Sequence, residues 1–327
     1  MARSHLTLAA LATSAVAGLD IAGAQPFGAP GGDYDTAILT GGDGRHWIIR
    51  VPRSERAEQE QSADLVALRA LSTGVRARLP FTVSTFAGQV PVDGTRAVVS
   101  EFVYGAKVPL AAMSIELAAS VGSAIAAIHA LPPNVVIDAG LPSHSSVEAL
   151  RAVVGLMDRA AATGLVPAAL LGRWERASEE PALWQFTPAV VNGALGSDSF
   201  LSANDEVTGV LGWHGLRVGD PAADLQWLAG AGGDIADAAF AAYSRVRGTV
   251  DRHLRQRAAL LAELEVARWL LHGTETRSTE IVDDAVQMLS DLVDETQKDL
   301  MNPIGGPTVP LGVDEVERLL ERTSRIH

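Results

Sequence analysis

The stretch Val190-Val-Asn-Gly-Ala-Leu-Gly-Ser-Asp-Ser-Phe-Leu201 decides the fold of this chain. Two further runs follow it closely, Val207-Thr-Gly-Val-Leu-Gly-Trp213 and Val218-Gly-Asp-Pro-Ala-Ala-Asp-Leu225. Short apolar runs broken by glycine and polar residues are typical of buried strands joined by tight turns. Residues 189–213 therefore form a strand-rich interruption in a half of the chain that is otherwise helical.

The preceding half, from residue 19 to about 105, carries mainly strand and turn signals. Gly41-Gly-Asp-Gly44 predicts a hairpin turn, because glycine and aspartate tolerate the positive φ that tight turns need. Gly28-Ala-Pro-Gly-Gly32 predicts a flexible loop. The predicted elements are strands at 35–40, 46–51, 81–86 and 96–103, and one helix at 54–71 with Ser54 as its N-cap.

Helical periodicity dominates after Gly105. The predicted helices span 114–130, 145–161, 166–178, 234–247, 251–272, 278–299 and 313–323. Gly230-Ala-Gly-Gly233 follows a helical run and predicts a helix C-cap, not a nucleotide loop. The sequence has neither a G-x-x-x-x-G-K-[ST] phosphate loop nor a G-x-S-x-G nucleophile turn.

The composition predicts a packed protein with more than one lobe, since 327 residues exceed what one core usually serves. Lys and Arg number 26 against 39 Asp and Glu, which gives a net charge of -13. Such a surface repels phosphate backbones and anionic lipids, so we expect neither nucleic acid nor a membrane as a partner. The sequence has no cysteine, and its eight histidines include no i,i+4 pair, which excludes thiolate chemistry and the usual zinc helix.

The N-terminus allows two interpretations. Arg3, the apolar run at 6–12 and Ala22-Gly-Ala24 could form a signal peptide. We favour a short amphipathic first helix that ends near Gly18, because Thr7, Thr13 and Ser14 interrupt the apolar run. No run of about 20 apolar residues exists that could span a bilayer. We therefore expect a cytoplasmic protein.

Three stretches resemble the aminoglycoside and macrolide phosphotransferases, which share the protein-kinase-like architecture. Trp47-Ile-Ile-Arg-Val-Pro-Arg53 is similar to their third N-lobe strand, and Ala126-Ala-Ile-His-Ala-Leu-Pro132 is similar to the end of their first large C-lobe helix. The runs at 190–201, 207–213 and 218–225 resemble the family's H-G-D-L-x-x-x-[NH]-x-L, V-x-G-[VI]-[IL]-D-W and V-G-D-P-x-x-D-L. The resemblance covers about residues 5–300 and is strongest to the macrolide 2'-phosphotransferase branch.

The resemblance implies an α+β, bilobal protein-kinase-like fold. Residues 1–105 would form an N-lobe of antiparallel sheet with the first helix, one further helix and a hinge at its end. Residues 106–301 would form a larger, mainly helical C-lobe, with the catalytic-loop equivalent at 190–225. Residues 302–327 would be a tail that is loosely docked or disordered.

The residues that carry the family's chemistry are replaced. Asn192 stands at the family's histidine and Ala194 at its catalytic aspartate. Ser199 and Gly212 stand at the two metal-ligand positions. Phosphoryl transfer needs a carboxylate to orient the attacking hydroxyl and a divalent metal to offset phosphate charge. Loss of a general base alone typically costs about 10²–10⁴ in rate.

Other positions retain the family's pattern. The resemblance implies that Arg50 holds the nucleotide phosphates, paired with Glu60 or with Glu58 on the following helix. The nucleotide base would lie against the hinge at Glu101, Phe102 and Val103. Asp220 and Asp224 would brace the catalytic loop. Asp198 and Asp205 are nearby acids that could substitute for the missing base, although solvated turn acids explain them as well.

The family's acceptor lies between the catalytic loop and the C-terminal helices. Two predicted helices supply an apolar wall for it, which suits a macrolactone better than a polyamine sugar, although core packing also explains each of these residues. The wall residues are Trp269, Leu270, Met288 and Leu292. Glu275 or Asp284 could meet a protonated amino sugar.

Three functions follow. The first is a catalytically impaired macrolide phosphotransferase, a pseudokinase of an antibiotic-resistance family that binds GTP or ATP with Mg²⁺ weakly, if at all. The second is a working antibiotic kinase that uses displaced acids such as Asp198 or Asp220. The third is a non-catalytic protein that binds an unrelated small molecule. In each case we expect a monomer with a small-molecule partner, a macrolide in the first two.

Overall fold

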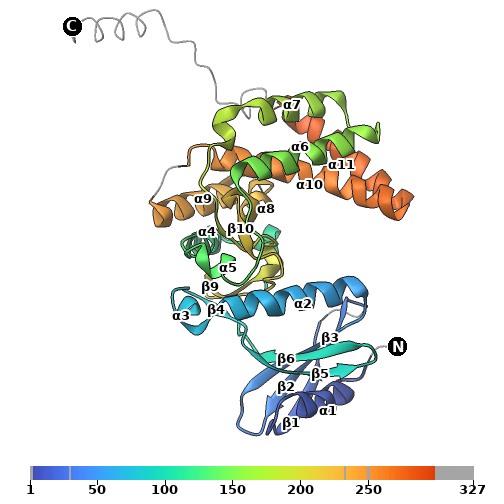
Figure 1. Ribbon diagram of the computed structural model, residues 1–327, viewed down its shortest axis with the longest axis vertical. Helices are drawn as coiled ribbons and strands as arrows, with labels where there is room; N and C mark the ends of the chain where they lie inside the picture. The colour runs from blue at the N-terminus through green and yellow to red at the C-terminus, as the bar shows by residue number, and fades with distance from the viewer. Residues whose placement is uncertain (1–2, 29–30, 232, 249–250, 299–327) are drawn as a thin grey trace, which may run out of the picture.

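The computed structural model describes residues 3–28, 31–231, 233–248 and 251–298. These residues form an N-terminal antiparallel sheet and a larger, mainly helical C-terminal part, as Figure 1 shows. The predicted α+β architecture is therefore confirmed. The predicted helix at 313–323 and the tail at 302–327 lie outside the described residues.

The N-terminal sheet has five strands in the order β1-β2-β3-β6-β5, and all neighbours are antiparallel. Burial alternates along β2, so one face of the sheet forms a core. The predicted hairpin turn joins β2 to β3, with Gly44 at a φ of 80° that favours glycine. The strands are β1 Ile21–Pro26, β2 Tyr34–Gly41, β3 His46–Pro52, β5 Phe86–Val92 and β6 Thr95–Glu101.

The predicted first helix, α1 (His5–Ala15), covers the buried face of this sheet. Ser4 caps it by accepting a hydrogen bond from the Thr7 amide. Leu8 and Ala12 are buried with the inward residues of the strands. The apolar run at 6–12 therefore supplies part of the core of the N-terminal sheet.

The segment after the sheet's third strand crosses to the C-terminal part. Helix α2 (Glu55–Ala70) begins at Ser54 as predicted, and the short α3 (Thr73–Arg76) follows. The strand predicted at 81–86 is wrong in length and partner. Only β4 (Thr82–Val83) forms, and it pairs in parallel with β9 (Glu206–Val210). The reason is that Phe81 and Val83 pack into the helical core instead of the N-terminal sheet.

The C-terminal part contains the predicted helices and the predicted strand-rich interruption. Gly230 caps the short helix α8, as predicted. None of the described helices is both long and apolar enough to cross a membrane. The helices are α4 Ile115–His129, α5 Asn134–Ile137, α6 Ser146–Ala162, α7 Ala168–Glu179, α8 Gln226–Ala229, α9 Gly233–Arg247, α10 Leu254–Thr276 and α11 Thr279–Lys298. The other elements are 3₁₀ turns η1 Leu110–Ala112, η2 Pro181–Trp184, η3 Ser197–Ser199 and η4 Pro221–Asp224, and strands β7 Ala189–Val191, β8 Phe200–Ala203 and β10 Arg217–Gly219.

The crossing of α4 and α9 positions the loop that follows β7. The two helices pack closely at Gly122, where a Cβ atom would lie 2.1 Å from the carbonyl oxygen of Ala239. The same pair brings His129, at the end of α4, against Tyr243 on α9. Glycine at 122 therefore sets the distance between the two helices that support the candidate site.

We predict that Gly122→Val lowers the free energy of unfolding by about 1–3 kcal/mol or more, because the added side chain overpacks a backbone contact. Gly155→Ala is the matched control, since Gly155 lies within α6 and a Cβ there would meet nothing within 4 Å. Alanine at 155 should stabilise the helix by roughly 0.5–1 kcal/mol. Urea unfolding followed by tryptophan fluorescence measures both, and equal effects would contradict the close-contact interpretation.

Candidate functional site

The catalytic-loop equivalent is shaped by one buried carboxylate. Asp224, in η4, accepts hydrogen bonds from the backbone amides of Asn192 at 2.7 Å and Gly193 at 2.6 Å. It also pairs with His129 Nε2 at 3.0 Å, and His129 Nδ1 meets the Tyr243 hydroxyl at 2.9 Å. Burial raises the pKa of the Tyr243 hydroxyl, which keeps this group protonated. The loop at the end of β7 is therefore fixed through its backbone.

Asn192 connects the catalytic-loop equivalent to the run at 207–213. Its side-chain amide donates to the carbonyl of Gly212 at 2.9 Å, and its carbonyl accepts from the amide of Ala194 at 3.1 Å. Asn192 is fully buried. The amide at the family's histidine position thus holds the run at 207–213 against the catalytic loop.

Three positions in this frame carry no carboxylate. Ala194 presents only a methyl group, and Gly212 adopts a φ of 72° with open space where a Cβ would lie. Ser199 is buried, and its hydroxyl accepts from the amide of Gly196 at 3.2 Å. Within the described residues no group of three or more Asp, Glu, His or Cys side chains could hold a metal. Because hard cations such as Mg²⁺ prefer carboxylate oxygens, these residues do not fit the metal that the family pattern implies.

The other acids near the loop have partners or lie in solvent. Asp220 is buried and forms an ion pair with Arg257, which also pairs with Asp251. Asp198 is highly exposed, with Lys107 at 3.9 Å. Asp220 therefore braces the structure, and its role as a catalytic acid finds no support in its contacts.

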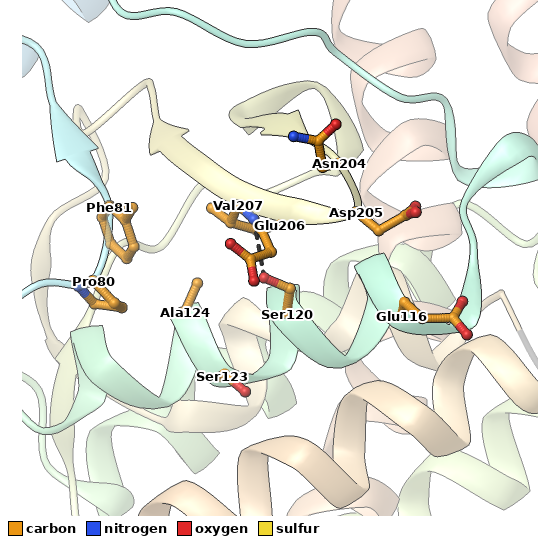
Figure 2. Close-up of a pocket in the computed structure, with 10 residues that line it drawn as sticks. All are labelled: Pro80, Phe81, Glu116, Ser120, Ser123, Ala124, Asn204, Asp205, Glu206 and Val207. Carbon is orange, nitrogen blue, oxygen red and sulfur yellow. Dashed lines mark hydrogen bonds between the residues drawn. The ribbon is translucent and has the colours of Figure 1, made fainter.

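Asp205 lies away from the catalytic loop, at the rim of an open cavity of about 630 Å³ between α4 and the turn from β8 to β9. Figure 2 shows Glu116, Ser120 and Ser123 along α4 on one side of it. Asp205 accepts a hydrogen bond from the Ser114 hydroxyl at 2.6 Å. This geometry agrees with the interpretation of Asp205 as a turn acid.

The residues predicted to bind a nucleotide lie on β3, on α2 and at the end of β6. The guanidinium of Arg50 lies 4.0 Å from the ring centre of Tyr34. Glu60 forms its ion pair with Arg56 at 3.0 Å, and Glu58 lies in the first turn of α2. Arg50 forms an ion pair with neither glutamate among the described residues, so the predicted pairing is absent from this structure.

Sequence reasoning missed Asp64. Its carboxylate accepts a hydrogen bond from the Trp213 amide at 2.6 Å, which links α2 directly to the run at 207–213. Burial raises the pKa of Asp64, and the Trp213 amide and Arg50 oppose that rise. Asp64 follows Ala57 by seven residues and precedes Leu68 by four, and both of these are buried. An acid on the buried stripe of a helix was the signal that could have revealed it.

Aromatic rings surround the predicted hinge. Phe102 donates its amide to the carbonyl of His46 at 3.1 Å, and its ring meets Tyr104 edge-on at 5.1 Å. Glu101 pairs with Arg45, and Val103 is buried. Tyr104 is exposed. The three predicted hinge residues thus lie where β6 passes into the C-terminal part.

The predicted acceptor wall divides into surface and core. Trp269 is partly exposed and donates to the Asp284 carboxylate at 2.8 Å, and Met288 is exposed on the neighbouring helix. Leu270 is fully buried, so its assignment to a ligand-facing wall is wrong: it faces the core side of α10. Leu292 is partly buried against the same core, and Glu275 has Arg159 at 3.9 Å.

Comparisons with known proteins agree with the fold described above. A family described as "Phosphotransferase enzyme family" matches residues 28–261. A search of curated proteins found no match. The kinase-like fold is confirmed by solved structures, including the macrolide 2'-phosphotransferase MphH from Brachybacterium faecium, at 22% identity and a TM-score of 0.73 over 88% of this chain and 98% of that one.

Two further structures cover the same shares, 88% of this chain and 98% of the other. One is a macrolide 2'-phosphotransferase type I, at 25% identity and a TM-score of 0.70. The other is the GDP complex of aminoglycoside 2'-phosphotransferase-IIIa, at 18% identity and a TM-score of 0.70.

We predict that Asp224→Asn lowers the free energy of unfolding by about 1.5–3 kcal/mol, the range for hydrogen bonds to a charged group. The amide can accept only through one oxygen and turns a donor toward the loop. Asp198→Asn is the matched control, because Asp198 is exposed and should change stability by less than about 0.5 kcal/mol. The urea unfolding midpoints of the two variants measure this difference in stability. An equal effect of both substitutions would refute the role given to Asp224.

The raised pKa of Asp64 predicts a pH dependence. In the unfolded chain this carboxyl titrates near ~3.9, so between that pH and its higher folded-state pKa the folded protein binds more protons than the unfolded one. Stability should therefore fall with rising pH in this window. Asp64→Asn keeps an acceptor for Trp213 and should gain stability relative to wild type as the pH rises. Unfolding of both proteins across a pH series measures this, and a constant difference would contradict it.

Proposed function

We propose that this chain, which belongs to the phosphotransferase enzyme family, binds a purine nucleotide and a macrolide-like small molecule but transfers phosphate slowly or not at all. The observation that carries the proposal is the contrast within the loop at 192–194. Its backbone is held in place by Asp224 and Asn192, while Ala194 offers no base to the acceptor hydroxyl.

The nucleotide half of the proposal rests on Arg50 and the hinge. Arg50 lies on β3 with no carboxylate within 4.0 Å in the described part of the chain, so its charge is available to a phosphate. Phe102 and Tyr104 offer aromatic rings at the hinge, where a planar base can pack. The aminoglycoside 2'-phosphotransferase-IIIa with the same fold was solved with GDP, which supports GTP as the nucleotide, with ATP as the alternative.

The macrolide half rests on the surface of α10 and α11. Trp269 and Met288 present apolar surface, and Asp284 holds the Trp269 indole in place while adding negative charge. An apolar wall beside a carboxylate suits a large ring that carries a protonated amine. Two of the solved structures that share this fold are macrolide 2'-phosphotransferases.

The role in transfer follows from charge and position. Without a carboxylate at 194, no base stands where the family's aspartate takes the proton from the attacking hydroxyl, and this loss costs about 10²–10⁴ in rate. Without the family's metal ligands at 199 and 212, the charge that develops on the transferred phosphate lacks its usual electrostatic offset. The surviving residues bind and orient ligands, and they supply no route for the proton.

We predict negligible conversion of erythromycin-like macrolides by the wild-type chain with GTP or ATP and magnesium. Mass spectrometry of the drug measures the phosphorylated product directly. A thermal-shift screen with nucleotides and macrolides in parallel shows whether ligands bind without turnover, because binding stabilises the folded state. Efficient conversion would overturn the proposal and would make Asp198 the first residue to replace.

We also predict that Ala194→Asp, Ser199→Asn and Gly212→Asp together recover magnesium-dependent nucleotide turnover, because the rest of the loop is in place. Ala194→Asp alone should recover little, since a base without bound metal leaves the phosphate charge unopposed. Calorimetry and a phosphate-release assay on both variants test this. Metal-dependent binding without turnover in the triple variant would reject this account of what is missing, and no nucleotide binding would favour a repurposed fold.

A further inference from the structure

Arg217 bridges the two segments that frame the catalytic loop. It lies on β10, which pairs antiparallel with β7, opposite Val191. Its Nη1 group donates to the carbonyl of Gly193 at 3.2 Å and to the carbonyl of Gly215 at 3.0 Å. The guanidinium is therefore anchored beside Ala194 by one nitrogen only.

Glycines make the space for this guanidinium. A Cβ atom on Gly193 would lie 1.8 Å from Arg217 Nη1, and a Cβ on Gly219 would lie 3.6 Å from its Nε. At Gly215 a Cβ would come within 3.1 Å of the Ala194 methyl group. Glycine at these three positions thus leaves room for the guanidinium and for the loop backbone that packs beside it.

The charge of Arg217 has no carboxylate partner within 4.0 Å in the part of the chain that the structure describes. The nearby acids are committed elsewhere, Asp220 to Arg257 and Asp224 to the loop amides and His129. Burial lowers the pKa of Arg217, Asp224 opposes this, and the like charge of Arg268 adds to it. A partly buried cation without a partner is costly to the fold, so an external anion would be stabilising there.

Three N–H groups of this side chain remain for a ligand. Arginine carries five, and Nη1 uses its two on Gly193 and Gly215. Among the described residues Nε and Nη2 have no hydrogen-bond partner, and neither atom is completely buried. This free edge has the fork geometry that matches two oxygens of a phosphate.

We propose that Arg217 is the centre of an oxyanion site beside the loop at 192–194, which takes a phosphate group directly through Nε and Nη2 without a divalent cation. The inference rests on the proposed function, because a bound nucleotide would supply that phosphate. The absence of carboxylates at 194 and 212 favours it, since acids there would repel an anion or neutralise the arginine. The site thus reverses the electrostatics of a metal-dependent kinase.

Calorimetric titration with inorganic pyrophosphate, in buffer freed of divalent metal by a chelating resin, tests the site. Wild type should bind, and added magnesium should not strengthen binding. Arg217→Gln should weaken binding about tenfold or more, the loss expected for a charge-assisted pair. Arg217→Lys should fall between them, because a point charge replaces the fork. Arg151→Gln, an exposed arginine on α6, should bind as wild type does.

Ala194→Asp is a second variant that keeps both backbone contacts of Arg217 and adds a carboxylate beside it. It should also weaken pyrophosphate binding, and it decides the matter if Arg217→Gln does not fold. Equal binding by wild type, Arg217→Gln and Ala194→Asp, no binding by wild type, or binding only with magnesium would overturn the proposal.

Guanosine and GDP separate this site from the nucleotide cleft itself. If GDP binds no more tightly than guanosine, and Arg217→Gln changes neither, the oxyanion site falls while nucleotide binding stands. If pyrophosphate binds through Arg217 but neither GDP nor guanosine binds, the site stands while the proposed function falls. GDP that binds more tightly than guanosine only when Arg217 is present supports both.

Discussion

The hydrogen bonds from the Asn192 and Gly193 amides to the buried carboxylate of Asp224 are the constraint on which the candidate site depends. They fix where β7 ends and where the loop turns, and they need no side chain from the loop itself. His129 on α4 pairs with the same carboxylate, and Tyr243 on α9 meets the other ring nitrogen of His129, so the loop is linked to the α4–α9 pair. The contacts that anchor this loop come from its backbone and from Asn192, and the side chain at 194 takes no part in them.

The chain keeps the frame of its family although Ala194, Ser199 and Gly212 depart from the family's pattern. The frame is set by glycines, buried polar groups and strand pairing, all of which are present from Asn192 to Asp224. The departures from the family's pattern fall at single positions on this frame and leave its hydrogen bonds in place. Asp64 and Arg217 lie on either side of this frame, and each contacts its backbone, at Trp213 and at Gly193. Both side chains therefore hydrogen-bond to the backbone of the frame.

Sequence patterns predicted the elements whose burial repeats regularly. The helix expected at 114–130 is α4 at Ile115–His129, and the helix expected at 145–161 is α6 at Ser146–Ala162. Sequence patterns failed where the position of an element depends on which part of the fold it packs against. The strand expected at 81–86 was assigned to the wrong sheet, because apolar alternation does not say which core receives it. Leu270 was predicted to contact a ligand because an apolar helix face has the same sequence pattern whether it lines a ligand site or packs in a core, and Leu270 is fully buried.

Within the candidate site, the spacing of the sequence motifs was enough to locate the three positions that carry no carboxylate. Motif spacing could not locate Asp64 or Arg217, because their roles depend on backbone groups elsewhere in the chain. Asp64 contacts the amide of Trp213, and Arg217 contacts the carbonyls of Gly193 and Gly215. Glu60 drew attention as an acid near the start of α2, but its ion pair is local.

The crossing of β4 to the C-terminal part has a consequence for how the chain folds during synthesis. Leu79, Phe81 and Val83 belong to the large C-terminal core, and the strand that β4 pairs with is β9. The ribosome releases β4 and the entire N-terminal sheet well before β9 exists. The N-terminal sheet can close early through β1-β2-β3-β6-β5, but the segment between α2 and β5 stays without its partner until residues 206–210 emerge. The apolar side chains of this segment are therefore buried later in synthesis than those of the N-terminal sheet.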